Sequence, residues 1–177
     1  MKKIVLCIAL AAFPIILSAQ SIFDKFEDMD DVSTVVVNQN MFKLFSRIEA
    51  DDPEAREFME MVKSLKDLKV FITEDKAVSE EMKATVDTYL KRSSLQELMR
   101  VKDKETNVKF YIRQGRDEDH VSELLMFVTG IKEVEANGRK IETVLLTLTG
   151  DIDLTKISTL TKKMNLPSEL EKADKNK

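Results

Sequence analysis

The sequence predicts an α+β fold: a two-layer sandwich with a largely antiparallel sheet and helices packed on one face, in the order β-α-α-β-α-β-β-β-β-α. Helical and strand-like patterns alternate in the first half of the chain, whereas four strand-like segments follow one another in the second half. Asn137-Gly138 separates two of these segments. An Asn-Gly pair in that position is typical of a β-hairpin, because both residues tolerate positive φ.

The first expected elements are a short helix at 21–28 and a β-branched strand at 32–38. The next helix has apolar residues at i, i+3, i+4 and i+7, a spacing that predicts one buried face. Phe42 lies off this stripe, so it could be exposed or could equally be buried under a neighbouring element. The residues of the stripe are Met41, Leu44, Phe45 and Ile48.

Asp52-Pro53 predicts the start of a second helix, with Asp52 as its cap and Pro53 in its first turn. A strand is expected at 68–74, and the first half of the chain could add a parallel neighbour to the sheet through a right-handed crossover. The apolar faces of the two helices flanking this strand are Ala55, Phe58, Met59, Val62 and Leu65 in the first, and Val78, Met82, Val86, Tyr89 and Leu90 in the second.

The four strand-like segments of the second half are 95–103, 107–114, 120–136 and 139–150. A last helix is predicted after Asp153, with Leu154, Ile157, Leu160 and Met164 facing inward, and Pro167 ends it. We therefore expect residues 20–166 to form a single α+β domain and residues 167–177 to be a charged mobile tail.

Residues 1–19 have the layout of a secretory signal peptide. Lys2 and Lys3 precede an apolar run at 4–17. A membrane-spanning helix needs about 20 apolar residues, so this run is too short to span. The expected cleavage lies between Ala19 and Gln20. Because the single cysteine, Cys7, falls inside this segment, the mature chain is expected to have no disulfide and no thiolate chemistry.

The acidic residues that precede the first strand are candidates for a ligand or cation site: Asp28, Asp30 and Asp31. They do not follow the calcium-loop pattern, because Val32 and Ser33 stand where a ligand and a glycine are required. The simpler hypothesis is that they keep the turn before the strand in water and protect its start from aggregation.

His120, the only histidine, lies near Asp117, Glu118, Asp119 and Glu123. A zinc site usually needs several nitrogen or sulfur ligands, so we expect no metal here and instead an exposed histidine at the start of a strand. We also expect no cofactor, since the sequence has no phosphate-binding glycine loop and no G-x-S-x-G motif.

Phe42 and Met61 both lie off the apolar stripes of their helices. If both are exposed, they would form a small apolar patch suited to a protein partner. The net charge of −4 argues against a nucleic-acid partner, which calls for a basic surface. We expect no stable membrane insertion of the mature chain.

Several blocks of the chain resemble, in order, one family of exported Bacteroidota proteins defined as a domain of unknown function, DUF4252. They are "FDKFEDMDDVSTVVVNQNMF", "LKVFIT", "YLKRSSLQELMRVKD", "NVKFYIRQG", "ELLMFVTG" and "LLTLTGDIDLTKISTLTKKM". The resemblance spans about residues 21–166 and implies an envelope or periplasmic setting, but no reaction and no site residues. Some relatives carry a lipid anchor; here Leu6 precedes Cys7, where that modification needs a small residue.

Together these observations favour a non-enzymatic binding or interaction module, periplasmic or secreted, with an envelope protein as partner. Two alternatives stay open. One is a carboxylate-dependent hydrolase that uses some of Glu27, Asp28, Asp30 and Asp31, which requires a cleft and a raised carboxyl pKa. The other is a regulatory or stress-response accessory of a membrane partner, which requires an exposed patch at Phe42 and Met61.

Overall fold

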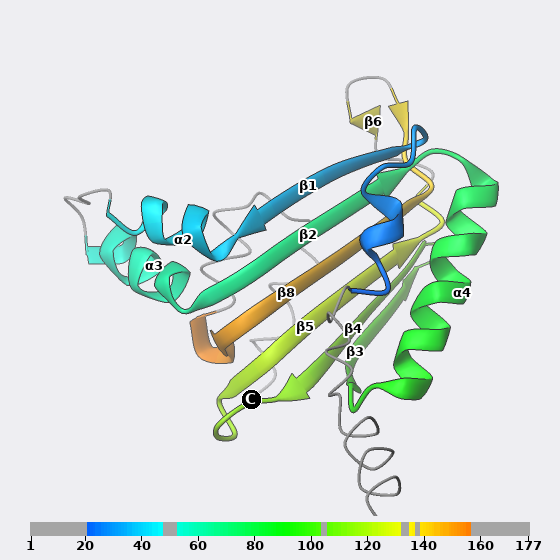
Figure 1. The fold of residues 1–177 in the computed structure, drawn as a ribbon. Helices are drawn as coiled ribbons and strands as arrows, with labels where there is room; N and C mark the ends of the chain where they lie inside the picture. Colours follow the sequence, from blue (N-terminus) through cyan, green and yellow to red (C-terminus); the bar gives the residue numbers. More distant parts are fainter. Residues whose placement is uncertain (1–20, 48–52, 104–105, 132–134, 137–138, 157–177) are drawn as a thin grey trace, which may run out of the picture.

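The computed structural model describes residues 21–47, 53–103, 106–131, 135–136 and 139–156. Its centre is a six-stranded antiparallel sheet with the strand order β1-β2-β8-β5-β4-β3 (Figure 1). This confirms the α+β class. The strands of this sheet are β1 (Val32–Asn38), β2 (Leu65–Thr73), β3 (Gln96–Asp103), β4 (Thr106–Gln114), β5 (His120–Thr129) and β8 (Thr143–Asp153).

β1 pairs with β2 in the antiparallel sense, so the parallel crossover considered for the first half is wrong. β5 and β8 form the predicted hairpin, and the short strands β6 (Glu135–Ala136) and β7 (Arg139–Lys140) pair on either side of Asn137-Gly138, which lies outside the described residues. The helices are α2 (Gln39–Phe45), α3 (Pro53–Lys63) and α4 (Lys76–Arg92), with single 3-10 turns η1 (Asp24–Phe26) and η2 (Leu154–Lys156).

The elements predicted at the two ends of the chain are only partly covered by the described residues. The helix expected at 21–28 is only the 3-10 turn η1. At the start of the last predicted helix the structure has the 3-10 turn η2, and the rest of that predicted helix, residues 167–177 and residues 1–19 lie outside the described residues.

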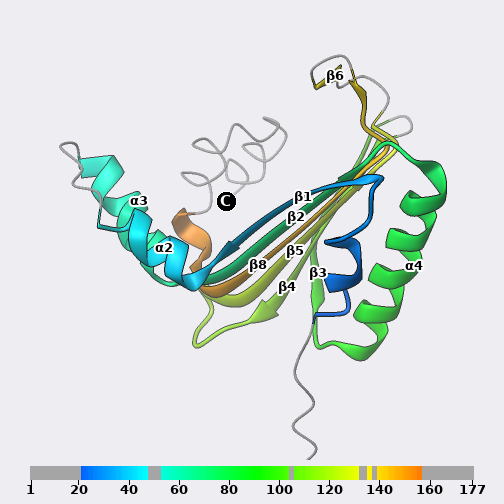
Figure 2. The same cartoon turned by 45° about the horizontal axis from the view of Figure 1, so that its top comes forward.

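The sheet has an apolar core on each face. α4 and η1 cover one face, called here the α4 face, and α2 and α3 pack at one end of the other (Figure 2). On β8, Leu145 faces α4 and Leu146 faces the opposite core, and both are buried. A strand that is buried on both faces loses the strict alternation of apolar and polar residues, as Val144, Leu145 and Leu146 show in succession on β8.

The two edges of the sheet differ in charge. β3 carries Glu97, Arg100 and Lys102 along its length, which is a common protection against edge-to-edge pairing. β1, at the other edge, has no charged residue between Val32 and Asn38. The unprotected edge is therefore the one that leads into α2.

Candidate functional site

The most exposed apolar surface in the described part of the chain lies at the β1 edge and on α2. Met41, Leu44 and Phe45 of α2 are exposed, as are Val35 and Val36 of β1. We call these five residues the β1–α2 surface. Apolar groups gathered at one edge of a domain are typical of protein interaction sites.

The exposure of α2 corrects the predicted orientation of this helix. The stripe of Met41, Leu44 and Phe45 was expected to face the core, and instead it faces solvent. Phe42, which lies off that stripe, is buried together with Met61 and Val62 of α3. The exposed patch expected at Phe42 and Met61 therefore does not form; its place is taken by the other side of α2.

A cap fixes how α2 continues from β1. The Asn38 side chain accepts hydrogen bonds from the backbone N–H groups of Asn40 (3.0 Å) and Met41 (3.1 Å). These bonds satisfy N–H groups that the first turn of a helix leaves free. Because Asn38 is also the last residue of β1, α2 follows the edge strand directly.

The outer edge of β1 has backbone groups available for pairing. The N–H of Val32 donates to the carbonyl of Met29 rather than to β2. Thr73 of β2 lies opposite Val32, and its carbonyl accepts a hydrogen bond from the N–H of Glu142. Val32 and Thr73 are thus a pair without mutual hydrogen bonds. Since backbone direction alternates along a strand, Thr34 and Val36 also point their N–H and C=O groups outward.

The three predicted site residues Asp28, Asp30 and Asp31 are all exposed around the start of β1. The backbone carbonyl of Asp31 accepts a hydrogen bond from the Thr73 hydroxyl at 2.8 Å, which ties the start of β1 to the end of β2. Within the described residues, no three His, Cys, Asp or Glu side chains are close enough to hold a metal ion.

Two other acidic residues of the same segment turn inward, which the sequence did not reveal. Asp24 and Glu27 both accept hydrogen bonds from the Lys69 ammonium of β2, at 2.5 and 2.6 Å. Burial alone would lower the pKa of Lys69, but these two bonds raise it overall. Asp67 lies beside them, and burial raises the pKa of its carboxyl despite the attraction of Lys69. This cluster fastens η1 to the sheet.

A second polar cluster lies on the same face between β4, β5 and α4. The buried Glu123 carboxylate accepts two hydrogen bonds from the Arg113 guanidinium, at 2.9 and 3.1 Å, and one from the Tyr89 hydroxyl at 2.7 Å. Burial, followed by the bond to Glu123, raises the pKa of Tyr89 to about 12. Every charge is paired, so the arrangement is suited to joining α4 to the sheet rather than to acid–base chemistry.

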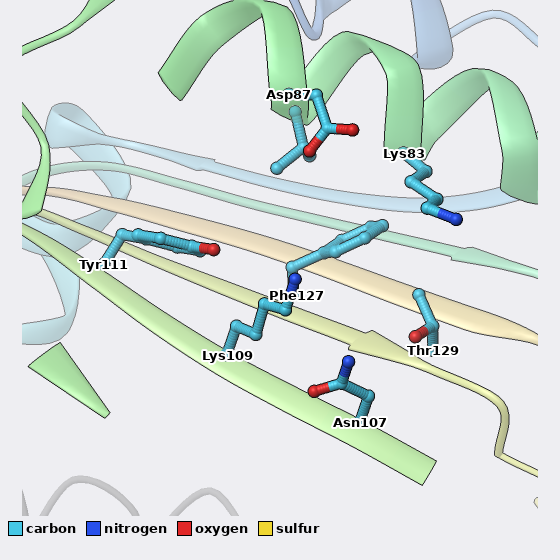
Figure 3. Close-up of a pocket in the computed structure, with 8 residues that line it drawn as sticks. Lys83, Asp87, Asn107, Lys109, Tyr111, Phe127 and Thr129 are labelled. Atoms are coloured by element: carbon cyan, nitrogen blue, oxygen red, sulfur yellow. The ribbon is translucent and has the colours of Figure 1, made fainter. Parts of the chain in front are cut away.

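A hollow of about 110 Å³ lies between α4 and strands β4 and β5. Figure 3 shows the residues that line it. Lys83 and Asp87 border it from α4, Lys109 and Asn107 from β4, and Phe127 lies at its centre. The buried side-chain oxygen of Asn107 has no hydrogen-bond partner among the described residues. Ligand pockets usually enclose about 300–1,000 Å³, so this hollow is small for a ligand site.

His120 is the first residue of β5, where a strand was expected to start, and it is half-buried rather than exposed. Its Nδ1 lies 2.6 Å from a carboxylate oxygen of Asp117, and its Nε2 contacts Arg116. The bond to His120 lowers the pKa of Asp117. Glu123, another of the four acidic residues expected near His120, instead forms an ion pair with Arg113.

The fold and this surface define an α+β domain with an apolar, unprotected sheet edge. The chain belongs to the family described as "Domain of unknown function (DUF4252)", whose sequence model matches residues 26–160. No curated protein and no solved structure matches the chain. Among the described helices, none is long and apolar enough to cross a membrane.

Proposed function

We propose that this chain is an exported protein of the Bacteroidota cell envelope that acts by binding another protein and not by catalysis. The leader-like segment at 1–19 supports export. Its partner is a protein of the same compartment, and the binding site is the β1–α2 surface.

The observation that carries the proposal is the position of exposed apolar side chains beside a free strand edge. Leu44 is 57 % exposed and Val35 is 52 % exposed, on adjoining elements. An open edge supplies backbone hydrogen bonds, and the flanking side chains supply contact area, as in peptide recognition by strand addition. By contrast, the polar clusters around Lys69 and Glu123 are internally paired.

Photo-cross-linking in living cells tests the proposal. A photoreactive residue at Leu44 is expected to give a reproducible protein adduct in the envelope fraction. The same residue at Leu98, which is 50 % exposed on the opposite edge, serves as the matched control. Adducts of equal yield at both positions, or none at Leu44, would show that the β1–α2 surface is not a binding site.

Export is tested separately. The protein recovered from the periplasm or the medium is expected to begin at Gln20 when its N-terminus is determined by mass spectrometry. A chain that stays in the cytoplasm with residues 1–19 attached would exclude the envelope setting, whatever the surface binds.

A further inference from the structure

We propose that the β1–α2 surface binds a second copy of the same chain, with the two β1 strands paired antiparallel so that the two sheets become one. This inference rests on the proposed function and names the partner of that site. Three features of the β1 edge support it: the backbone, the side chains and the charges each permit β1 to pair with a two-fold related copy of itself.

The backbone of β1 permits a symmetric pairing. Thr34 and Val36 point their N–H and C=O groups outward, as shown above. A two-fold axis at Val35 places Thr34 opposite Val36 of the partner subunit, and the reverse, so that both residues form reciprocal hydrogen bonds. The Val32 amide, which is already bonded to Met29, is not needed.

The side chains of the edge tolerate this pairing on both faces. Val35 would meet its own copy across the axis, on the face of the sheet opposite α4, where its β2 neighbour Val70 lies. Cross-strand pairs of β-branched residues stabilise sheets, whereas like charges placed opposite each other destabilise them. β1 has no charged residue that would lie opposite a charge of its copy. On β3, by contrast, pairing with a second β3 would place like charges opposite each other in several registers.

The charges at the two ends of the edge favour the antiparallel direction. The exposed carboxylates of Asp28, Asp30 and Asp31 surround the start of β1, and the exposed cations Lys43 and Arg47 follow its end. Residues 39–47 contain no carboxylate. An antiparallel copy brings each acidic end to a basic end, whereas a parallel copy would bring like charges together. The acidic cluster thereby orients the two chains.

Disulfide trapping tests the pairing and its register. In a Cys7→Ser background, the chain has no other cysteine, so a single Val35→Cys substitution is expected to give a covalent dimer on mild oxidation. Ser33→Cys is the register control, because Val37 of the partner subunit would stand opposite it. Leu98→Cys on the β3 edge is the control for exposure. Equal trapping at Val35 and Leu98, or trapping at Ser33 but not Val35, would overturn the proposed pairing.

Sedimentation of the purified chain tests the role of charge without any cysteine. The double substitution Asp30→Lys, Asp31→Lys is expected to weaken dimerisation at least tenfold. Adding Lys43→Glu and Arg47→Glu to that variant should restore it, since the two ends are then complementary again. A wild-type chain that remains monomeric at all concentrations overturns the second-copy proposal. If Leu44 nevertheless cross-links to another envelope protein in cells, the proposed function stands with a different partner.

Discussion

Phe42 and Leu44 lie two positions apart on α2 and face opposite surroundings: Phe42 is 5 % exposed and Leu44 is 57 % exposed. Two helical positions turn the side-chain direction by about 200°, so one helix can face the core with Phe42 and solvent with Leu44. Phe42 packs with Met61 and Val62 of α3, which holds α2 in this orientation.

This relationship predicts very different costs for the same kind of substitution. Phe42→Ala should lower the free energy of unfolding by about 3–4 kcal/mol, because it leaves a cavity in a packed core. Leu44→Ala should change the unfolding free energy of the monomer by less than about 0.5 kcal/mol. Urea denaturation at low protein concentration checks both. Similar losses in the two variants would mean that α2 packs through its other side.

Arg113→Met should lower the free energy of unfolding by about 2–3 kcal/mol, since it leaves the buried Glu123 carboxylate with only the Tyr89 hydroxyl. The matched control is Arg100→Met, which breaks the exposed ion pair with Glu97 and should have a much smaller effect on the free energy of unfolding. Thermal and urea unfolding would compare the two. Adding Glu123→Leu to Arg113→Met should recover part of the loss, because the unpaired charge is then gone.

Alkaline pH should weaken the attachment of α4 through Tyr89. Its pKa is raised from 10.0 to about 12 in the folded state, so the protonated phenol stabilises the fold fully below pH 10. That contribution is lost as the pH rises from about 10 towards 12. In a Tyr111→Phe background, Tyr89 is the only tyrosine, and its phenolate absorbance can be followed directly. A titration midpoint near 10 in the folded protein would contradict the bond to Glu123.

Gly150→Ala should lower the free energy of unfolding by more than about 2 kcal/mol. Gly150 has φ +147°, which side chains rarely adopt, and an added Cβ would lie 2.6 Å from the Ser64 carbonyl oxygen. Thr149→Ala at the neighbouring position is the control, with an expected cost below about 1 kcal/mol. Equal stability of the two variants would mean that Gly150 and Ser64 do not approach each other this closely.

The strands were predictable because their patterns are local. The β-branched run of β1 and the Asn-Gly pair between the last two predicted strands, 120–136 and 139–150, each specify an element within a few residues. The orientation of α2 was not predictable in this way. A period of 3.6 residues shows that Met41, Leu44 and Phe45 share one side of a helix, but not whether that side faces a core or solvent.

The candidate site depended on information that the sequence does not display. That β1 is a sheet edge follows from its pairing with β2 alone among the described strands, which is a property of the strand order. Likewise, Asp24 and Glu27 meet Lys69 only because η1 folds back on the sheet. Side chains more than forty positions apart leave no local pattern, so the inward and outward acidic residues looked alike.

The place of β8 in the sheet also sets the order in which the domain can be completed. Among the described strands, β1 and β2 are joined in the sheet to β3, β4 and β5 through β8, which is the last of these strands to be synthesised. Until residue 143 and its successors are available, a nascent chain can form two separate sheets but not one. Such high contact order makes folding slow, and any truncation before β8 divides the domain.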